Sequence, residues 1–204
     1  MFDSGISVKS LIEELKNTEV DISLEIPNIT YITWLNAVQQ LLYTDIIKEQ
    51  RKTVLQPPFS SPVSISSIAT ENNENTPRFE DIHTIYADDT QLIKSTVTSG
   101  VIFDNTFYKD NDNIGYNTDF TPEKLTIVHF VKPALITVDD NDEINDANVM
   151  IPVEFIDLVK AKLRGEAYKL ANEDNIAAKW LNDYNTLLET FKVWIVEKTT
   201  NFGM

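Results

Sequence analysis

The sequence predicts an α+β protein in which the N- and C-terminal helices form a helical bundle and a small antiparallel β module is inserted between them. Residues 1–56 and 149–204 carry apolar side chains at the three- and four-residue spacing of helices. Residues 57–148 instead show short alternating runs interrupted by Asn, Asp, Gly and Pro. Charge supports the division, because residues 66–148 hold 16 of the 32 acidic residues but only 5 of the 17 basic ones. We therefore expect residues 1–56 and 149–204 to form one helical core and residues 57–148 the inserted module.

Composition limits the possible functions. The chain has 204 residues, and 42% of them are hydrophobic, which is enough for a real core. The net charge of −15 argues against binding nucleic acid through its phosphates, because such binding needs clustered Lys and Arg. The sequence shows neither a membrane-spanning apolar run nor the basic and apolar regions of a signal peptide. With no cysteine, disulfides and thiolate chemistry are excluded, although this says little about the compartment. Because neither a membrane span nor a signal peptide is seen, we expect a soluble protein made inside the cell.

Two helices are predicted in the N-terminal part. Ser7 can cap the first, whose apolar stripe is Val8, Leu11, Ile12 and Leu15. The second starts after Pro27 and is predicted to reach about Arg51, with apolar residues at helical spacing as far as Ile46. The proline-rich segment 56–62 cannot continue a helix and is interpreted as a stiff linker.

Five or six short strands are predicted in the middle of the chain. They share β-branched or aromatic residues and flanking turn signals, and they cover residues 64–69, 79–86, 91–97, 106–109, 114–117 and 125–131. This spacing predicts a small antiparallel sheet or sandwich. The acidic stretch 139–146 that follows is predicted to be a solvated loop.

Two further helices are predicted at the C-terminal end, forming an antiparallel pair that packs on the long N-terminal helix. Pro152 suits the first turn of one, and residues 172–175 separate it from a second helix whose apolar stripe reaches Ile195. Gly165 within the first helix lowers the stability of that helix by about 1 kcal/mol relative to alanine. We therefore interpret it as a position where another backbone approaches the helix closely. The tail from Thr199 is expected to be loose unless a partner orders it.

The acidic clusters do not predict a metal site. Asp110 and Asp112 fit positions one and three of an EF-hand calcium loop, but Ile114 and Thr121 occupy positions five and twelve, where oxygen ligands are required. The stretch 139–146 also lacks the glycine and glutamate at the required spacing. Solvated acidic loops are therefore the favoured interpretation.

No catalytic motif accompanies the two histidines. His83 and His129 fall within predicted strands, without a serine elbow, a phosphate-binding glycine loop or an HExxH helix. We predict structural roles for both, and for the chain no enzymatic activity, no cofactor and no metal. The alternative is an enzyme or ligand-binding module whose site is assembled across the inserted part.

Five segments follow one another in an order that is informative. They are Ile6–Ile12 (ISVKSLI), Thr33–Gln40 (TWLNAVQQ), Leu125–Pro133 (LTIVHFVKP), Ile151–Val159 (IPVEFIDLV) and Ala177–Tyr184 (AAKWLNDY). In this order the chain resembles the head-to-tail adaptor (connector, or neck) proteins of tailed bacteriophages, over about residues 6–197. That family has no catalytic residues to transfer.

The resemblance implies a structural virion protein, located in the neck and assembled in the host cytoplasm. It implies a ring of identical subunits, usually a dodecamer, which contacts the portal protein and tail proteins and continues the DNA channel. DNA would pass through without specific binding, and no membrane would be involved. The acidic composition suits such a conduit, since a basic lumen would hold DNA. A tail-completion or tail-terminator ring is the alternative role.

Four apolar residues near the C-terminus are candidates for docking a partner. Trp194, Ile195, Val196 and Phe202 lie at the end of the last apolar helix and in its tail. One interpretation is that Trp194 and Ile195 complete the helical core. The other is that the segment becomes ordered against a portal-like partner or a neighbouring subunit, covering an apolar patch.

Overall fold

The computed structural model describes residues 2–18, 24–57, 61–68, 74–95 and 103–202, with only the backbone for residues 199–202. The chain divides into two compact units. The helical unit combines Met1–Ile47 with Leu135–Met204, and the sheet unit is Lys48–Ala134.

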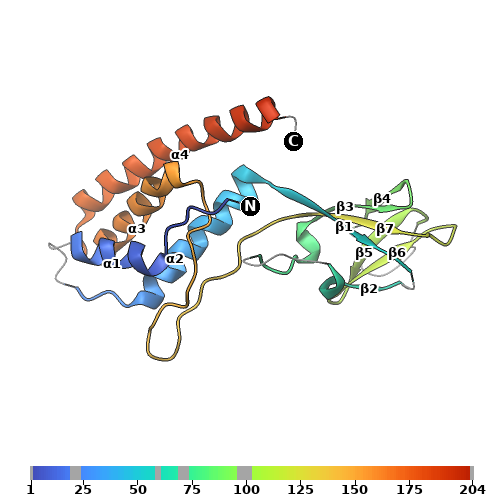
Figure 1. The fold of residues 1–204 in the computed structure, drawn as a ribbon, viewed down its shortest axis with the longest axis horizontal. Helices are drawn as coiled ribbons and strands as arrows, with labels where there is room; N and C mark the ends of the chain where they lie inside the picture. The colour runs from blue at the N-terminus through green and yellow to red at the C-terminus, as the bar shows by residue number, and fades with distance from the viewer. Residues whose placement is uncertain (1, 19–23, 58–60, 69–73, 96–102, 203–204) are drawn as a thin grey trace. The chain divides into compact units, whose positions relative to one another are not determined.

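In the part that the structure describes, the helical unit contains four α-helices. They are α1 (Val8–Thr18), α2 (Asn28–Leu41), α3 (Ile156–Leu170) and α4 (Asp174–Phe202). The π-helical turn η1 (Leu42–Ile47) extends α2, and the 3-10 turn η4 (Val153–Phe155) precedes α3. Helices α3 and α4 lie side by side and antiparallel, and α3 also packs against α2, which confirms the predicted arrangement (Figure 1).

One hydrophobic core joins these helices. It draws on α1, α2, α3 and α4 together, and Trp34 of α2 and Leu188 of α4 both pack against it. Gly165 lies at a close approach of α3 and α4, because a Cβ at this position would stand 2.7 Å from Leu181 Cδ2 and 3.4 Å from the Leu181 backbone nitrogen. The predicted close approach at Gly165 is therefore confirmed.

The connector of residues 135–152 is held along α2 by polar side chains. The Asn36 amide donates to the Ile136 carbonyl at 2.8 Å and accepts from the Ile136 N–H at 3.0 Å. Gln39, which is buried, accepts from the Met150 N–H. These bonds satisfy backbone groups of a segment that has little regular structure of its own.

Asp142 of the connector caps the N-terminus of α2. Its Oδ2 accepts from the Asn28 N–H at 2.6 Å, and its Oδ1 accepts from the Ile29 N–H at 2.7 Å. The first N–H groups of a helix lack partners within the helix, and negative charge is favoured beside them. The stretch 139–146, predicted to be a solvated loop, thus also supplies a cap to a distant helix.

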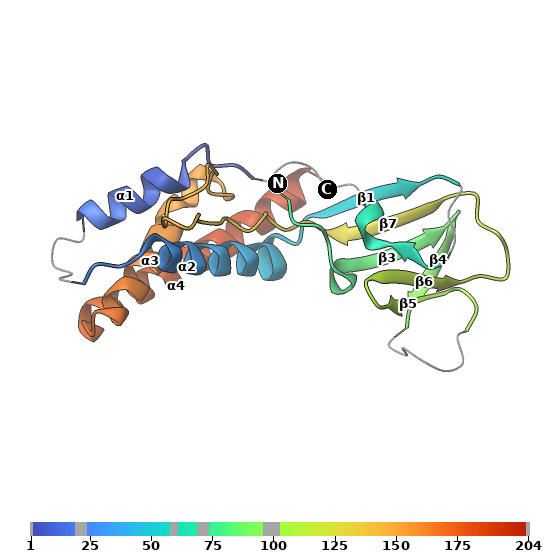
Figure 2. The same cartoon turned by 90° about the horizontal axis from the view of Figure 1, so that it is seen from below.

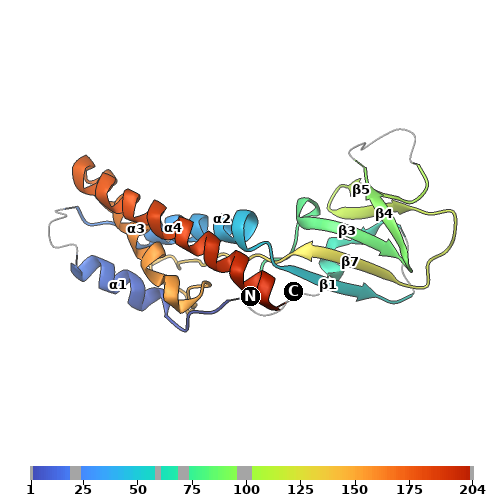
Figure 3. The same cartoon turned by 90° about the horizontal axis from the view of Figure 1, so that it is seen from above.

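In the described part of the sheet unit, seven strands form one curled sheet. They are β1 (Gln50–Leu55), β2 (Val63–Ser64), β3 (Ile82–Ala87), β4 (Thr90–Lys94), β5 (Thr106–Asp110), β6 (Asn113–Asn117) and β7 (Leu125–Phe130). Their order is β1-β7-β3-β4-β5-β6-β2, and all neighbours are antiparallel except β4 and β5, which are parallel. Strand β1 forms one edge, beside β7 (Figures 2 and 3).

The predicted fold class, a helical bundle with a small inserted antiparallel β module, is wrong. The β part is a curled, seven-stranded sheet with one parallel strand pair and a hydrophobic core of its own. Its core residues are Val63, Ile68, Phe79, Ile82, Ile85, Ala87, Leu92, Phe107, Ile114, Leu125 and Ile127. The sheet is therefore a compact unit with its own core rather than a small insertion in a bundle.

The predicted element boundaries need two corrections. The α-helix predicted to reach Arg51 ends at Leu41, and Lys48, whose φ is 50°, separates η1 from β1. The strand predicted over residues 64–69 is the short β2 followed by a 3-10 turn, with residue 69 outside the described residues. In both places, contacts with distant residues override the local pattern.

Candidate docking surface on helix α4

Four aromatic side chains meet at the C-terminal half of α4. They come from the N-terminal segment (Phe2), from η4 (Phe155) and from α4 itself (Phe191 and Trp194). The Phe155 ring centroid lies 4.8 Å from that of Phe191 and 5.3 Å from that of Trp194. The Phe2 and Trp194 centroids are 5.8 Å apart. Separations of this size are those of favourable aromatic pairs, so the cluster holds the Trp194 indole in place.

Beside this cluster α4 carries a shallow groove of about 490 Å³. Its lining residues are Phe155, Glu189, Thr190, Val193, Trp194 and Glu197. The side chains of Glu189, Val193 and Glu197 share one face of α4, since they are spaced by four residues. Val193 is 59% exposed. Glu189 pairs with Lys192 at 2.7 Å, whereas Glu197 makes no ion pair with any residue that the structure describes. The groove therefore has an apolar floor and one rim carboxylate, Glu197, that is not ion-paired within the described residues, while the Lys198 ammonium lies 5.2 Å from the centre of the Trp194 ring.

The four predicted docking residues are placed differently from one another. Trp194 is half-buried in the aromatic cluster, and Ile195 is buried in the helical core. Val196 is exposed. Phe202 lies in the last turn of α4, and its side chain falls outside the described residues. The tail expected to be loose from Thr199 is helical as far as the structure describes it.

Of the six residues that line the groove, sequence reasoning had pointed only to Trp194. Val193 lies off the predicted stripe of α4, and an apolar β-branched residue at a solvent-facing helix position was the available signal. Glu197 gives no signal in isolation. Phe155 joins the groove from a turn far away in the sequence, which spacing within α4 cannot reveal.

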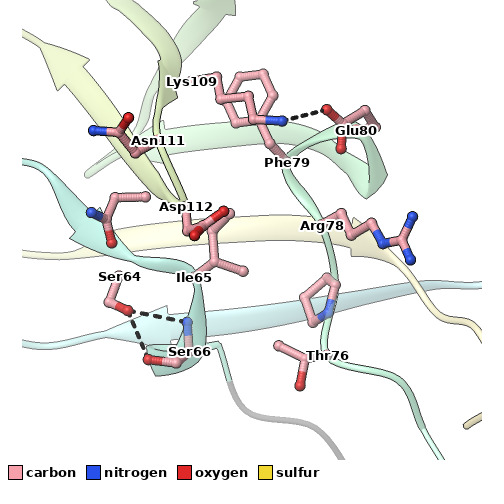
Figure 4. A pocket seen from close by; sticks show the side chains of 12 residues that line it. Ser64, Ile65, Ser66, Thr76, Arg78, Phe79, Glu80, Lys109, Asn111 and Asp112 are labelled. Carbon is pink, nitrogen blue, oxygen red and sulfur yellow. Dashed lines mark hydrogen bonds and ion pairs between the residues drawn. The ribbon is translucent and has the colours of Figure 1, made fainter.

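A second depression, of about 430 Å³, lies on the sheet unit (Figure 4). Nine of its twelve lining residues are polar or charged; the lining comprises Ser64, Ile65, Ser66, Thr76, Pro77, Arg78, Phe79, Glu80, Lys109, Asn111, Asp112 and Asn113. The Lys109 ammonium lies 3.0 Å from the Glu80 carboxylate, and the hydrogen bond it donates lowers the pKa of Glu80. The hydroxyls of Ser64 and Ser66 lie 2.7 Å apart. These groups satisfy one another rather than converging on a common point.

The two histidines have different environments. His129 of β7 is 2% exposed and lies between Arg51 of β1 and Ile82 of β3. Its Nδ1 is 3.3 Å from the Phe130 carbonyl, and its Nε2 has no hydrogen-bond partner within the described residues. Burial is the main cause that lowers the pKa of His129 below 6.5, which favours a neutral ring at pH 7. His83 of β3 is exposed, and its ring lies 5.5 Å from that of Phe130.

The acidic stretch 139–146 forms a hydrogen-bonded turn. Asp139 Oδ1 accepts from the Asn141 N–H at 2.8 Å and from the Glu143 N–H at 2.9 Å. These bonds, that of Glu143 foremost, lower the pKa of Asp139. In the residues that the structure describes, no three or more His, Asp or Glu side chains are grouped as metal ligands.

The structure redistributes the negative charge. The sheet unit holds 12 acidic and 8 basic residues, and the helical unit holds 20 and 9. The stretch 139–146 belongs to the helical unit, so most of the excess charge lies there and not in the strands. Among the described helices, none is both long and apolar enough to cross a membrane.

No model of a known protein family matches the sequence, and no curated protein matches it either.

Proposed function

We propose that the chain is a structural assembly protein, a head-to-tail adaptor of a tailed bacteriophage that forms a ring between portal and tail. The observation that carries the proposal is the groove beside Trp194. An apolar floor left open to solvent and rimmed by polar groups is typical of a surface that binds another protein. A ring subunit needs such surfaces, because each copy contacts two neighbours.

Two further features support this proposal. The order of the five segments between residues 6 and 184 resembles that of the adaptor family. The net charge of −15, most of it on the helical unit, suits a conduit that lets DNA pass without retaining it.

Locating the protein in the particle tests the proposal. Antibodies against the purified chain should label the neck, between portal and tail, in electron micrographs of phage particles that carry the gene. Labelling at the far end of the tail tube would instead identify a tail-terminator ring. If the protein is absent from purified particles, the proposed assembly function is refuted.

Two biochemical tests accompany the localisation. A variant lacking residues 196–204 should lose only the helical signal of the removed end of α4 and keep its thermal stability, because the described side chains beyond Ile195 are exposed, yet it should not enter particles. Normal incorporation would show that the end of α4 does not dock.

In an electrophoretic shift assay, the isolated protein should leave duplex DNA unshifted at physiological salt. A shift at low micromolar protein would contradict the role assigned to the negative charge.

A further inference from the structure

We propose that the groove on α4 binds the exposed face of strand β1 from a second copy of this chain. The inference rests on the proposed function, since it names one contact through which a ring of identical subunits would form. The exposed face of β1 consists of Gln50, Lys52 and Val54, which alternate with the less exposed Arg51 and Thr53.

Charge restricts the possible occupants of the groove. Two copies of a chain with net charge −15 repel each other, and a contact that brings a positive surface against a negative one offsets this repulsion. The negative surface is the groove rim, where Glu197 makes no ion pair in the described part of the chain. Its occupant should therefore carry an apolar side chain next to an unpaired cation.

The segment around β1 has the positive charge that this contact requires. Lys48, Arg51 and Lys52 form a run of three basic residues within five positions. Arg51 pairs with Glu74, but Lys48 and Lys52 are exposed and make no ion pair with any described residue.

A second basic run is already occupied by contacts inside the helical unit. Lys160 binds Glu14 at 2.6 Å, Lys162 binds Glu166 at 2.6 Å, and the Arg164 guanidinium lies 4.7 Å from the centre of the Trp180 ring. Of the two runs, the one at β1 is thus the one available to a partner.

The spacing of the two surfaces is compatible. Val54 is 51% exposed on the edge strand of the sheet, so it can be buried against Val193 and Trp194. Residues two apart on a strand lie about 6.6 Å from each other, and residues four apart on a helix are separated by about 6 Å along its axis. With Val54 on Val193, Lys52 lies level with Glu197, one turn further along α4.

The contact joins two different surfaces of the same chain. Each copy would offer its groove to one neighbour and its β1 face to another. A head-to-tail contact of this kind produces a closed ring when the rotation between copies is suitable.

A charge exchange in the full-length protein tests the contact. Self-association is measured by sedimentation velocity over a concentration series, with circular dichroism to verify folding. Lys52→Glu and Glu197→Lys should each weaken association about tenfold or more, because each places like charges opposite one another. The double variant should recover most of the loss. Lys9→Glu and Glu13→Lys make the same charge changes at exposed positions of α1 and should associate like the wild type.

Each alternative outcome decides against the contact. Single variants that associate like the controls would refute it while leaving a ring, and so the proposed function, intact. Weakened single variants without recovery in the double variant would show that Lys52 and Glu197 do not meet. A wild-type chain that stays monomeric at every concentration would overturn both the contact and a self-assembling ring. If Glu197→Lys blocks binding of purified portal protein but not self-association, the occupant is the portal.

Discussion

Replacing Asp142 with glycine tests how the connector holds α2. The change removes the carboxylate that accepts from the Asn28 and Ile29 N–H groups, while glycine adopts the φ of 61° at this position without strain. Losing a side-chain cap costs about 0.5–2 kcal/mol, and losing its charge beside the helix terminus costs about 0.3–1 kcal/mol more. Because Asp142 caps two donors and is half-buried, we expect a loss of about 2 kcal/mol.

The assay is urea unfolding at pH 7, followed by ellipticity at 222 nm to report on the helices. With a slope of about 2 kcal/mol per molar urea, a loss of 2 kcal/mol lowers the midpoint by about 1 M. Asp140→Gly is the matched control, because it removes an exposed carboxylate from the same turn and adds similar freedom to the unfolded chain. If the two variants unfold at the same midpoint, Asp142 does not stabilise α2 through its carboxylate.

Three further changes have defined outcomes. Gly165→Val should destabilise the protein by about 1–3 kcal/mol in the same urea assay, because even a Cβ at this position would crowd Leu181. An unchanged midpoint would mean that α3 and α4 can move apart there without a loss of stability. Burial lowers the pKa of His129 in the folded protein below 6.5. Because the unfolded chain then takes up the proton more readily, the free energy of unfolding is highest above pH 6.5 and decreases as the pH falls below it. His129→Gln should therefore flatten the decline in stability between about pH 7 and pH 5, whereas His83→Gln, at an exposed position of β3, should keep the wild-type profile. The pKa of Asp139 is lowered from 3.8, so its carboxylate stabilises the folded protein above that pH, and this stabilisation is lost as the pH falls further. A carboxyl titration by NMR should give a value below 3.8 for Asp139.

The sequence predicts elements well where one face of a helix meets one core. Helices α1, α3 and α4 follow their apolar stripes for this reason. The predicted end of the second helix is too late, because the apolar spacing stops at Ile46 within η1 and the chain turns at Lys48 before it reaches Arg51. Strand β1 has almost no alternation of its own and is defined by its pairing with β7, where Gln50 lies opposite Phe130. A pairing partner so far away leaves no local signature.

The candidate surface was predictable only in part. Trp194 stands out because an apolar side chain lies where a helix end usually becomes polar. Its partners Phe2 and Phe155 come from the opposite end of the chain and from a turn, so only the folded chain brings them together. The same holds for Asp142, whose partner Asn28 is 114 residues away.

The division of the helical unit between the two ends of the chain affects how the protein is synthesised. The sheet unit is continuous, so it can fold on the ribosome as soon as β7 has emerged. The N-terminal cap of α2 forms only after Asp142 has been synthesised, and its apolar face is covered only after α3 has followed. Once the sheet has folded, the effective loop between the two segments of the helical unit, Met1–Ile47 and Leu135–Met204, is shorter, which reduces the entropy cost of bringing these segments together. A chain whose translation stops before α4 would lack the groove and would leave the helical core incomplete.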